Sequence, residues 1–255
     1  MLKVRIIPCL QLIDQSLVKT VQFVKYGYIG DPINTVRIFN ELEVDELCFL
    51  DIRATLQNRS PNLKILSEIA NECFMPLSYG GGIRDIEMAK KILSIGFEKI
   101  IINTAAIENP NLITEIAKHS GNQSVIVSID VKKSFIGGYH VYSNDGTKKT
   151  NLSVIEWALR AESLGAGELL LTSMDREGTW KGFDLEIIKK VVESVSIPVI
   201  ANGGAGNIMD IADVVYKGNA SAVAIGSIVV YQQKDMGVLV NFPDKQKLGQ
   251  ILNLN

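Results

Sequence analysis

Residues 76–83 of the chain read PLSYGGGI, and residues 198–206 read PVIANGGAG. Each stretch is a short apolar run that follows a proline and ends in a glycine-rich turn, which is typical of a buried strand that runs into a loop. Gly81 and Gly204 stand 123 positions apart. This repetition predicts that the chain contains two related halves.

Two further pairs of segments repeat at nearly the same spacing. Asp51 ends the run FLD and Asp175 ends the run TSMD, at an offset of 124 residues, while Thr104 and Ser227 stand 123 residues apart in INTA and IGSI. A constant shift of about half the chain favours two duplicated half-barrels.

Apolar runs alternate with amphipathic segments along the whole chain. We expect eight strands, at residues 5–10, 46–50, 76–79, 99–102, 125–130, 168–172, 198–201 and 222–225. Repeated strand–helix alternation predicts a parallel sheet, and 255 residues is the usual size of an eight-fold barrel. The sequence therefore predicts an α/β fold, a single (β/α)8 TIM barrel of two duplicated half-barrels, forming one domain over residues 1–255. An open doubly wound sheet is the alternative.

The segments between the strands carry helical periodicity. Expected helices cover residues 31–42, 85–95, 109–118, 154–164, 184–195 and 208–216. Asp31 and Asn109 each precede a proline, so both are predicted to cap a helix that has proline in its first turn.

Two of the connections are long. Residues 11–30 are expected to form a loop after the first strand, and residues 131–150 follow the fifth. The second connection contains the turn signals Gly137-Gly138 and Asn144-Asp145-Gly146, which predict a hairpin. Both follow strands, so we expect both at the face of the barrel where active sites form.

Composition excludes several classes of function. The net charge of −2 argues against nucleic-acid binding, because proteins that bind nucleic acid usually carry an excess of basic residues. Cys9, Cys48 and Cys73 are widely spaced in apolar runs, which indicates reduced core thiols in a cytoplasmic protein. With only His119 and His140 and no paired cysteine motif, we expect no metal and no other cofactor. The sequence predicts neither a signal peptide nor a membrane segment.

The glycine turns and the small polar residues after the strands predict two phosphate-binding half-sites at one mouth of the barrel. Glycine lets backbone N–H groups approach an anion, and the next helix N-terminus adds a favourable dipole. The candidate residues for a small phosphorylated ligand are Gly81, Gly82, Asn103, Thr104, Gly178, Thr179, Gly203, Gly204, Gly226 and Ser227. Asp51 and Asp175 also end strands, and a role in the pocket and a role in stabilising a turn are equally favoured for them.

Asp130 ends the fifth strand and is the candidate general acid or base. The structural alternative is a carboxylate that pairs with Lys132 or caps a turn. The matching position on the first strand is Gln11, whose amide binds hydrogen-bond partners but does not exchange protons. Lys19 lies in the first long connection and, taken alone, is expected to be a solvated charge.

These residues lie in segments that resemble the cyclase subunit of imidazole glycerol phosphate synthase over nearly the whole chain. The matching segments include RIIPCL at 5–10, GDP at 30–32, GGGI at 80–83, INTAA at 102–106 and LTSMDR at 171–176. The resemblance implies a glutaminase partner on the N-terminal face of the barrel and ammonia that crosses the barrel to the opposite mouth. There the cyclase combines ammonia with a bis-phosphorylated ribulosyl aminoimidazole carboxamide. The products serve histidine and purine synthesis.

The resemblance also assigns site residues. It implies an ammonia gate of four charged residues at Arg5, Glu46, Lys99 and Glu168. Of the family's two catalytic aspartates, Asp130 is present, whereas Gln11 stands at the other position. Glu177 replaces an aspartate and Asn202 replaces a serine. Losing one of two acid/base groups commonly costs a factor of about 10² to 10⁴ in rate, which counts against ordinary cyclase activity.

A side branch of this family matches more closely, in LVKTV at 17–21, PIN at 32–34, ECFMP at 72–76 and VLVNFP at 238–243. That branch is associated with bacterial surface polysaccharide, and it implies an ammonia conduit that serves a separate sugar amidotransferase acting on an N-acetyl sugar. This hypothesis is favoured. The alternatives are a working cyclase, in which Asp130 acts alone or with Lys19, and a scaffold that only activates its glutaminase, against which the two phosphate loops argue.

Overall fold

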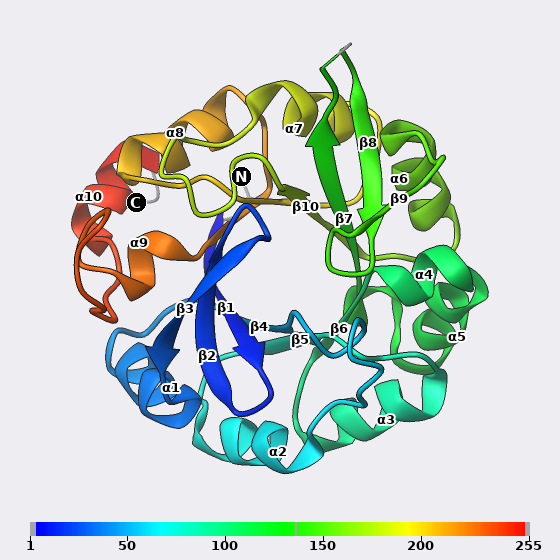
Figure 1. Ribbon diagram of the computed structural model, residues 1–255, viewed down its shortest axis with the longest axis horizontal. Coiled ribbons are helices and arrows are strands. Elements are labelled where there is room, and N and C mark those ends of the chain that lie inside the picture. The colour runs from blue at the N-terminus through cyan, green and yellow to red at the C-terminus, as the bar shows by residue number, and fades with distance from the viewer. Residues whose placement is uncertain (1–3, 136, 253–255) are drawn as a thin grey trace.

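Eight parallel strands form a closed barrel in the computed structural model, which describes residues 4–135 and 137–252 (Figure 1). The barrel strands are β1 (Arg5–Ile13), β4 (Leu47–Asp51), β5 (Leu77–Gly80), β6 (Lys99–Ile102), β7 (Val125–Lys133), β10 (Glu168–Ser173), β11 (Val199–Asn202) and β12 (Ala222–Ile225). Each pairs in parallel with the next, and β1 pairs with β12 to close the ring, with Arg5 opposite Ala222. The predicted TIM barrel is confirmed, and the open sheet is wrong.

Helices cover the outside of the barrel. They are α1 (Pro32–Glu41), α2 (Leu63–Glu72), α3 (Ile86–Ile95), α4 (Thr104–Glu108), α5 (Asn111–Ser120), α6 (Val154–Ser163), α7 (Leu185–Val192), α8 (Ile208–Tyr216), α9 (Ser227–Val230) and α10 (Lys245–Leu252), with a short 3-10 helix at Asn122–Ser124. Asp31 caps α1 as predicted, because its carboxylate accepts a hydrogen bond from the Asn34 N–H at 2.8 Å. The predicted cap at Asn109 is wrong: Pro110 takes that position, and no side chain caps α5.

The first long connection is a β-hairpin, and the prediction of a loop over residues 11–30 is wrong. β1 continues to Ile13 and pairs antiparallel with β2 (Ser16–Val21), which pairs with β3 (Lys25–Gly30). The turn between β2 and β3 places Gln22 at φ 51° and Phe23 at φ 63°. Because non-glycine residues rarely adopt this left-handed conformation, the sequence carries no turn signature there.

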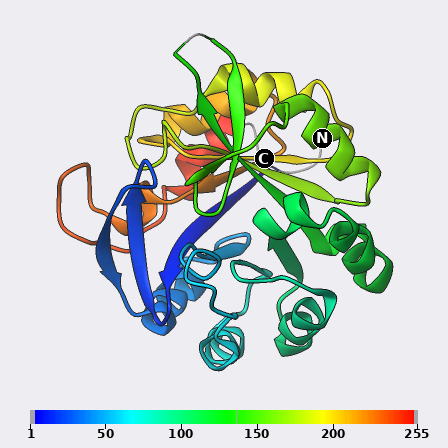
Figure 2. The same ribbon diagram turned by 45° about the vertical axis from the view of Figure 1, so that its right-hand side comes forward.

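The second connection is the hairpin that its turn residues predicted. β7 pairs antiparallel with β8 (Tyr139–Ser143), which pairs with β9 (Lys148–Lys149). Figure 2 shows this green hairpin and the blue β2–β3 hairpin standing off the rim of the barrel. The rim at the C-terminal ends of the strands is therefore built up on two sides.

The two halves of the barrel share backbone geometry where their sequences repeat. Asn103 precedes α4 with φ −120° and ψ −84°, and Gly226 precedes α9 with φ −114° and ψ −77°. The residue that follows β6 therefore has nearly the same backbone conformation as the residue that follows β12, half a barrel away, as expected for repeated units.

Two apolar layers hold the barrel together. One lies between the strands and the helices and includes Phe39 and Phe49, both fully buried. The other fills the inside of the barrel and includes Ile7, Ile101 and Leu170. Among the described residues, no helix has both the length and the apolar character to cross a membrane.

Replacing Phe39 with alanine is expected to lower the free energy of unfolding by about 3–5 kcal/mol, because it leaves a cavity between α1 and the barrel. The control is Ile38→Ala on the same helix, where the side chain is 38% exposed and the expected loss is about 0.5 kcal/mol. Urea denaturation measures both. Equal losses would contradict this assignment of the buried face of α1.

Candidate active site

Four charged side chains close the N-terminal end of the barrel in a ring. Arg5 donates to Glu46 at 2.7 Å and to Glu168 at 2.8 Å. Lys99 donates to Glu46 at 3.1 Å and to Glu168 at 2.9 Å. Each cation therefore binds both carboxylates, and each carboxylate binds both cations. The structure brings together all four residues that the resemblance assigned to a gate.

Apolar side chains line the barrel directly above this ring. Ile7, Ile101, Ile126, Leu170 and Ile200 surround a cavity of about 10 Å³, which is about the space that one water-sized molecule needs. Glu46 of the ring also lines this cavity, which is called the lumen below.

Two thiols also face the lumen. The Sγ atoms of Cys9 and Cys48 lie 3.7 Å apart, and both cysteines are free and buried. The hydrogen bond with Cys48 and burial both raise the pKa of the Cys9 thiol. The Cys9 thiol is therefore expected to stay protonated and uncharged.

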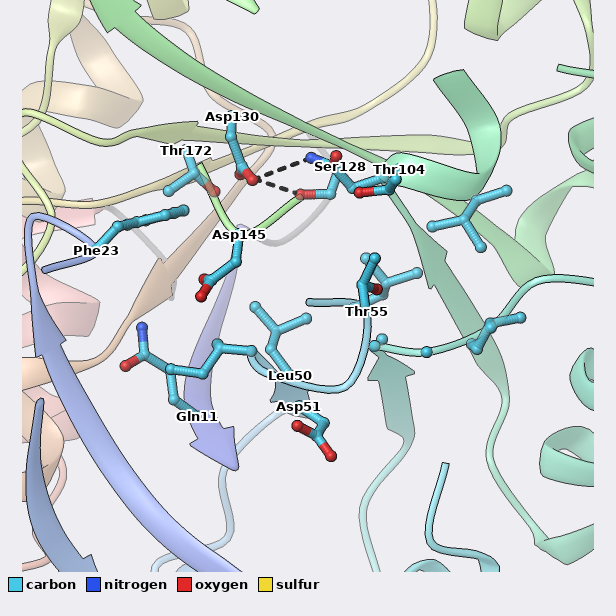
Figure 3. A pocket seen from close by; sticks show the side chains of 18 of the residues that line it. Gln11, Phe23, Leu50, Asp51, Thr55, Thr104, Ser128, Asp130, Asp145 and Thr172 are labelled. Carbon is cyan, nitrogen blue, oxygen red and sulfur yellow. Dashed lines mark hydrogen bonds between the residues drawn. The ribbon is translucent and has the colours of Figure 1, made fainter. Parts of the chain in front are cut away.

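A pocket of about 110 Å³ opens at the other end of the barrel, where the strands end. Figure 3 shows Gln11, Asp51, Asp130 and Asp145 around it. Of the predicted residues of the first phosphate half-site, the pocket is lined by Gly81, Gly82, Asn103 and Thr104. No group of His, Cys, Asp and Glu side chains that could hold a metal ion occurs in residues 4–135 and 137–252.

The second predicted half-site borders a separate cavity of about 490 Å³. The predicted residues that line this cavity are Lys19, Gly178, Thr179 and Ser227. Gly203, Gly204, Gly226 and Asp175 line neither cavity. Residues predicted for the two half-sites therefore line two cavities of one mouth, and Thr20 lines both cavities.

The glycine turns have a structural reason beside any role in binding. Gly81 has φ +118°, and a Cβ atom there would collide with the carbonyl oxygen of Asp51. Gly204 has φ +116°, and a Cβ atom there would collide with the carbonyl oxygen of Gly182. Close approach of two backbone segments therefore requires glycine at both positions.

Asp130 reaches the pocket from the end of β7. Its carboxylate accepts hydrogen bonds from Asn103 Nδ2 at 3.0 Å and Ser128 Oγ at 3.5 Å, so the predicted alternative of a pair with Lys132 is wrong. Burial, with the negative charge of Asp145 as the second cause, raises the pKa of Asp130 to about 7. A carboxyl group with this pKa can take up and release a proton near neutral pH.

Gln11 is held rigidly at the matching place on β1. Its Nε2 donates to Glu177 Oε1 at 3.0 Å, and its Oε1 accepts a hydrogen bond from the Thr20 N–H at 2.7 Å. Lys19 Nζ donates to the same Glu177 oxygen and to the carbonyl oxygen of Thr20. The amide of Gln11 is therefore occupied by protein partners.

Lys19 is not a solvated charge, so that expectation is wrong. It is 4% exposed and forms an ion pair with the buried Glu177. The β2–β3 hairpin folds back over the strand ends and carries Lys19 inward, which the prediction of a loop did not anticipate.

The two strand-end aspartates stabilise turns. Asp51 accepts two hydrogen bonds from Arg59, both at 3.1 Å, and two from the N–H groups of Arg53 and Ala54, although it also lines the pocket. Asp175 accepts a hydrogen bond from the Lys133 N–H at 2.8 Å and so ties down the β7–β8 hairpin.

Sequence reasoning missed several residues of the pocket wall, and Phe23 and Asp145 are two of them. Both lie at the tips of the excursions, and Asp145 was interpreted only as part of a turn signal. The pKa of Asp145 is raised to about 6, chiefly by burial, although Arg53 Nη1 lies 3.3 Å from its carboxylate. The signal that could have identified Asp145 was a carboxylate in a turn that follows a barrel strand at the mouth.

Known proteins resemble the chain along almost its entire length. A family model described as "Histidine biosynthesis protein" matches residues 5–235. Two relatives carry the name "Putative imidazole glycerol phosphate synthase subunit". The hisF2 subunit of Pseudomonas aeruginosa is 50% identical, and the match covers 97% of this chain and 99% of the relative. The HisF subunit of Leptospira interrogans is 46% identical, and the match covers 96% of this chain and 97% of the relative. "Imidazole glycerol phosphate synthase subunit HisF" of Alkaliphilus metalliredigens is 44% identical, and the match covers 91% of this chain and 92% of the relative.

The buried pair of Lys19 and Glu177 predicts a large effect of Glu177→Gln. This change leaves the Lys19 ammonium group buried without a counter-charge, which should lower the free energy of unfolding by about 3–5 kcal/mol in urea denaturation. The control is Glu186→Gln, which removes an exposed partner of Lys133 and Lys190 and should cause no measurable loss. A similar stability for both variants would contradict the buried pair.

Asp130 predicts a pH-dependent cost in stability. Its folded pKa of about 7 lies above the ordinary aspartate value of 3.8, so the unfolded chain releases this proton first as pH rises. Stability therefore falls from about pH 4 to about pH 7 and then stays level. Asp130→Asn should be about 1–3 kcal/mol more stable than the unmodified chain at about pH 8 and about equal at pH 4. The same difference at both pH values in urea denaturation would refute the raised pKa.

Proposed function

The chain belongs to the histidine biosynthesis protein family, among the cyclase subunits of imidazole glycerol phosphate synthase, and from that premise we propose that it is an ammonia conduit. In this proposal a glutaminase subunit docks on the N-terminal face of the barrel and releases ammonia. The ammonia crosses the lumen and is used to amidate an N-acetyl sugar in bacterial surface polysaccharide synthesis.

The ring of Arg5, Glu46, Lys99 and Glu168 is the observation that carries the proposal. The Glu46 side chain is 4% exposed and that of Lys99 13%. Withdrawing such charges from water costs several kcal/mol per ion, and well-packed apolar residues often serve stability as well or better. A purely stabilising purpose is therefore poorly motivated, whereas a ring across the barrel axis offers a gate.

The lumen supports the same proposal. Neutral ammonia and water are similar in size, and the cavity above the ring has space for about one such molecule. Glu46, the one carboxylate in its wall, is already paired with Arg5 and Lys99, and most of the other lining side chains are apolar. We therefore expect this passage to favour the uncharged form over a cation. Ammonia would therefore pass as NH₃.

The state of Gln11 argues against chemistry that needs two aspartates. Its amide is already bound to Glu177 and to the backbone of Thr20, and an amide does not exchange protons. A barrel that keeps its gate and lacks one acid/base group fits a conduit better than a cyclase.

The proposal includes several partners. A sugar amidotransferase would receive ammonia at the mouth, and a small phosphorylated ligand would occupy the two cavities. We place the complex in the cytoplasm, where the three free cysteines would stay reduced.

A working cyclase of histidine biosynthesis is the second candidate, and Asp130 favours it. A carboxyl group with a pKa of about 7, placed beside glycine turns suited to phosphate, is what general acid–base catalysis requires. In that case Asp130 acts alone or with Lys19.

Cyclase turnover by the purified chain separates the two candidates. The assay supplies the bis-phosphorylated ribulosyl aminoimidazole carboxamide and ammonium salt, so no glutaminase is needed, and it compares the unmodified chain with Gln11→Asp. The conduit proposal predicts that the unmodified chain is silent, or slower than the variant by at least about 10²-fold. Turnover by the unmodified chain at the rate of an ordinary enzyme would overturn the proposal and support the second candidate.

A further inference from the structure

The β8–β9 turn holds Asp145 at a fixed place above the pocket. The Asn144 N–H donates to Thr104 Oγ1 at 2.8 Å, which ties the turn to the first residue of α4. A Cβ atom at Gly146 would lie 2.5 Å from Met174 Cε and 2.8 Å from Phe23 Cδ2, so the turn also packs tightly against its neighbours. Asp145 is therefore carried by a supported turn that is linked to the first phosphate half-site.

The carboxylate of Asp145 points into the pocket between Asp130 and Gln11 (Figure 3). Its side chain is 10% exposed, and Arg53 Nη1 lies 3.3 Å from Oδ2. Arg53 also lies over the ring of Tyr26, 5.9 Å from its centroid. The charge of Asp145 contributes to the raised pKa of Asp130, so the two carboxyl groups face each other within electrostatic reach.

Two further polar atoms in the same pocket have no hydrogen-bond partner in the described structure. Thr20 is 5% exposed, and its Oγ1 is one of them. The other is Asn103 Oδ1, because the Asn103 amide group donates through Nδ2 to Asp130. Buried polar atoms that lack partners carry a cost that a ligand can relieve.

The chemical character of these atoms restricts what can bind. Asp130, Asp145 and the amide oxygen of Asn103 all present acceptors to the pocket. An acceptor-lined wall is satisfied by a hydrogen-bond donor, and an ionised carboxylate prefers a charged donor. Gln11 also lines the pocket but carries no charge, and one donor and one acceptor site of its amide are already used by Glu177 and Thr20.

We propose that Asp145 is the second ligand-binding carboxylate of this mouth, and that with Asp130 and Asn103 it receives a positively charged or donor nitrogen of the ligand, such as an ammonium, amine or amidine group. The phosphate of the same ligand lies at Gly81, Gly82 and Thr104. This inference rests on the phosphorylated ligand of the proposed function and adds its second functional group.

Asp145 thus supplies, from the β8–β9 turn, the second carboxylate that is absent from the first strand, where Gln11 stands. Arg53 neutralises it in the free protein, and a nitrogen cation competes for the same oxygen atoms. Thr104 supports this geometry as well: its oxygen accepts from Asn144, so its hydroxyl proton stays available to a phosphate.

Binding of two matched probes tests the inference. Phosphoethanolamine carries a phosphate and an ammonium group, whereas ethyl phosphate carries only the phosphate. In calorimetric titrations of the whole chain at about pH 8, phosphoethanolamine is expected to bind about tenfold more tightly, as a charge-assisted hydrogen bond allows. Asp145→Asn should remove that preference and leave the affinity for ethyl phosphate unchanged. Equal affinities in the unmodified chain, or a preference that survives Asp145→Asn, would overturn the inference.

Two control variants separate ligand contact from a structural role. Arg53→Gln keeps a hydrogen-bond donor beside Asp145 but removes the competing charge, so the preference should persist or increase. Loss of the preference in Arg53→Gln would show that Asp145 only positions Arg53, which also overturns the inference. Asp14→Asn removes a carboxylate from the β1–β2 turn, outside the pocket, and should change neither affinity.

The same titrations distinguish this inference from its premise. Binding of ethyl phosphate without any preference for phosphoethanolamine refutes the nitrogen site and leaves the phosphorylated ligand in place. Failure of both probes to bind refutes the phosphate half-site and the inference together. Neither result depends on ammonia, glutaminase or sugar, so the conduit is tested separately.

Discussion

The rest of the structure depends on the closed ring of ion pairs among Arg5, Glu46, Lys99 and Glu168. Two cations and two carboxylates satisfy one another across the start of the barrel. This balance is what permits four charges to stand beside an apolar lumen, because removal of any one leaves an unequal number of positive and negative charges in the ring. The ring also gives the barrel two different ends. Its N-terminal end carries the ring of ion pairs, while its C-terminal end opens into a pocket.

The two half-barrels share a frame but differ in chemistry. Asn103 and Gly226 place α4 and α9 with nearly the same backbone angles, yet only the first half presents an amide that binds Asp130. The same asymmetry separates Gln11, an amide bound to Glu177 and to the Thr20 N–H, from Asp130, a carboxyl group whose pKa lies near neutrality. Of the two matching strand positions, therefore, only Asp130 carries a carboxylate, whereas Gln11 carries an amide.

Most of the fold could be predicted from the sequence, since β-branched strands and glycine turns are local signals with a local cause. The four ring residues were found through a resemblance rather than a pattern, because no local rule says that residues 5, 46, 99 and 168 meet. Lys19 was misjudged for a related reason: its burial depends on a hairpin whose turn, at Gln22 and Phe23, lacks glycine. Asp145 was visible as a turn residue, but only the folded excursion shows that it faces the pocket.

Passage of ammonia through the barrel is the central claim, and an isotope experiment tests it most directly. The chain is assembled with a glutaminase subunit and the proposed sugar amidotransferase, and glutamine labelled with ¹⁵N in its amide is supplied with an excess of unlabelled ammonium. A closed passage predicts that the nitrogen added to the sugar is almost entirely ¹⁵N, whatever the concentration of ammonium outside. Dilution of the label in proportion to external ammonium would show that ammonia reaches the acceptor through solvent, and would contradict the account.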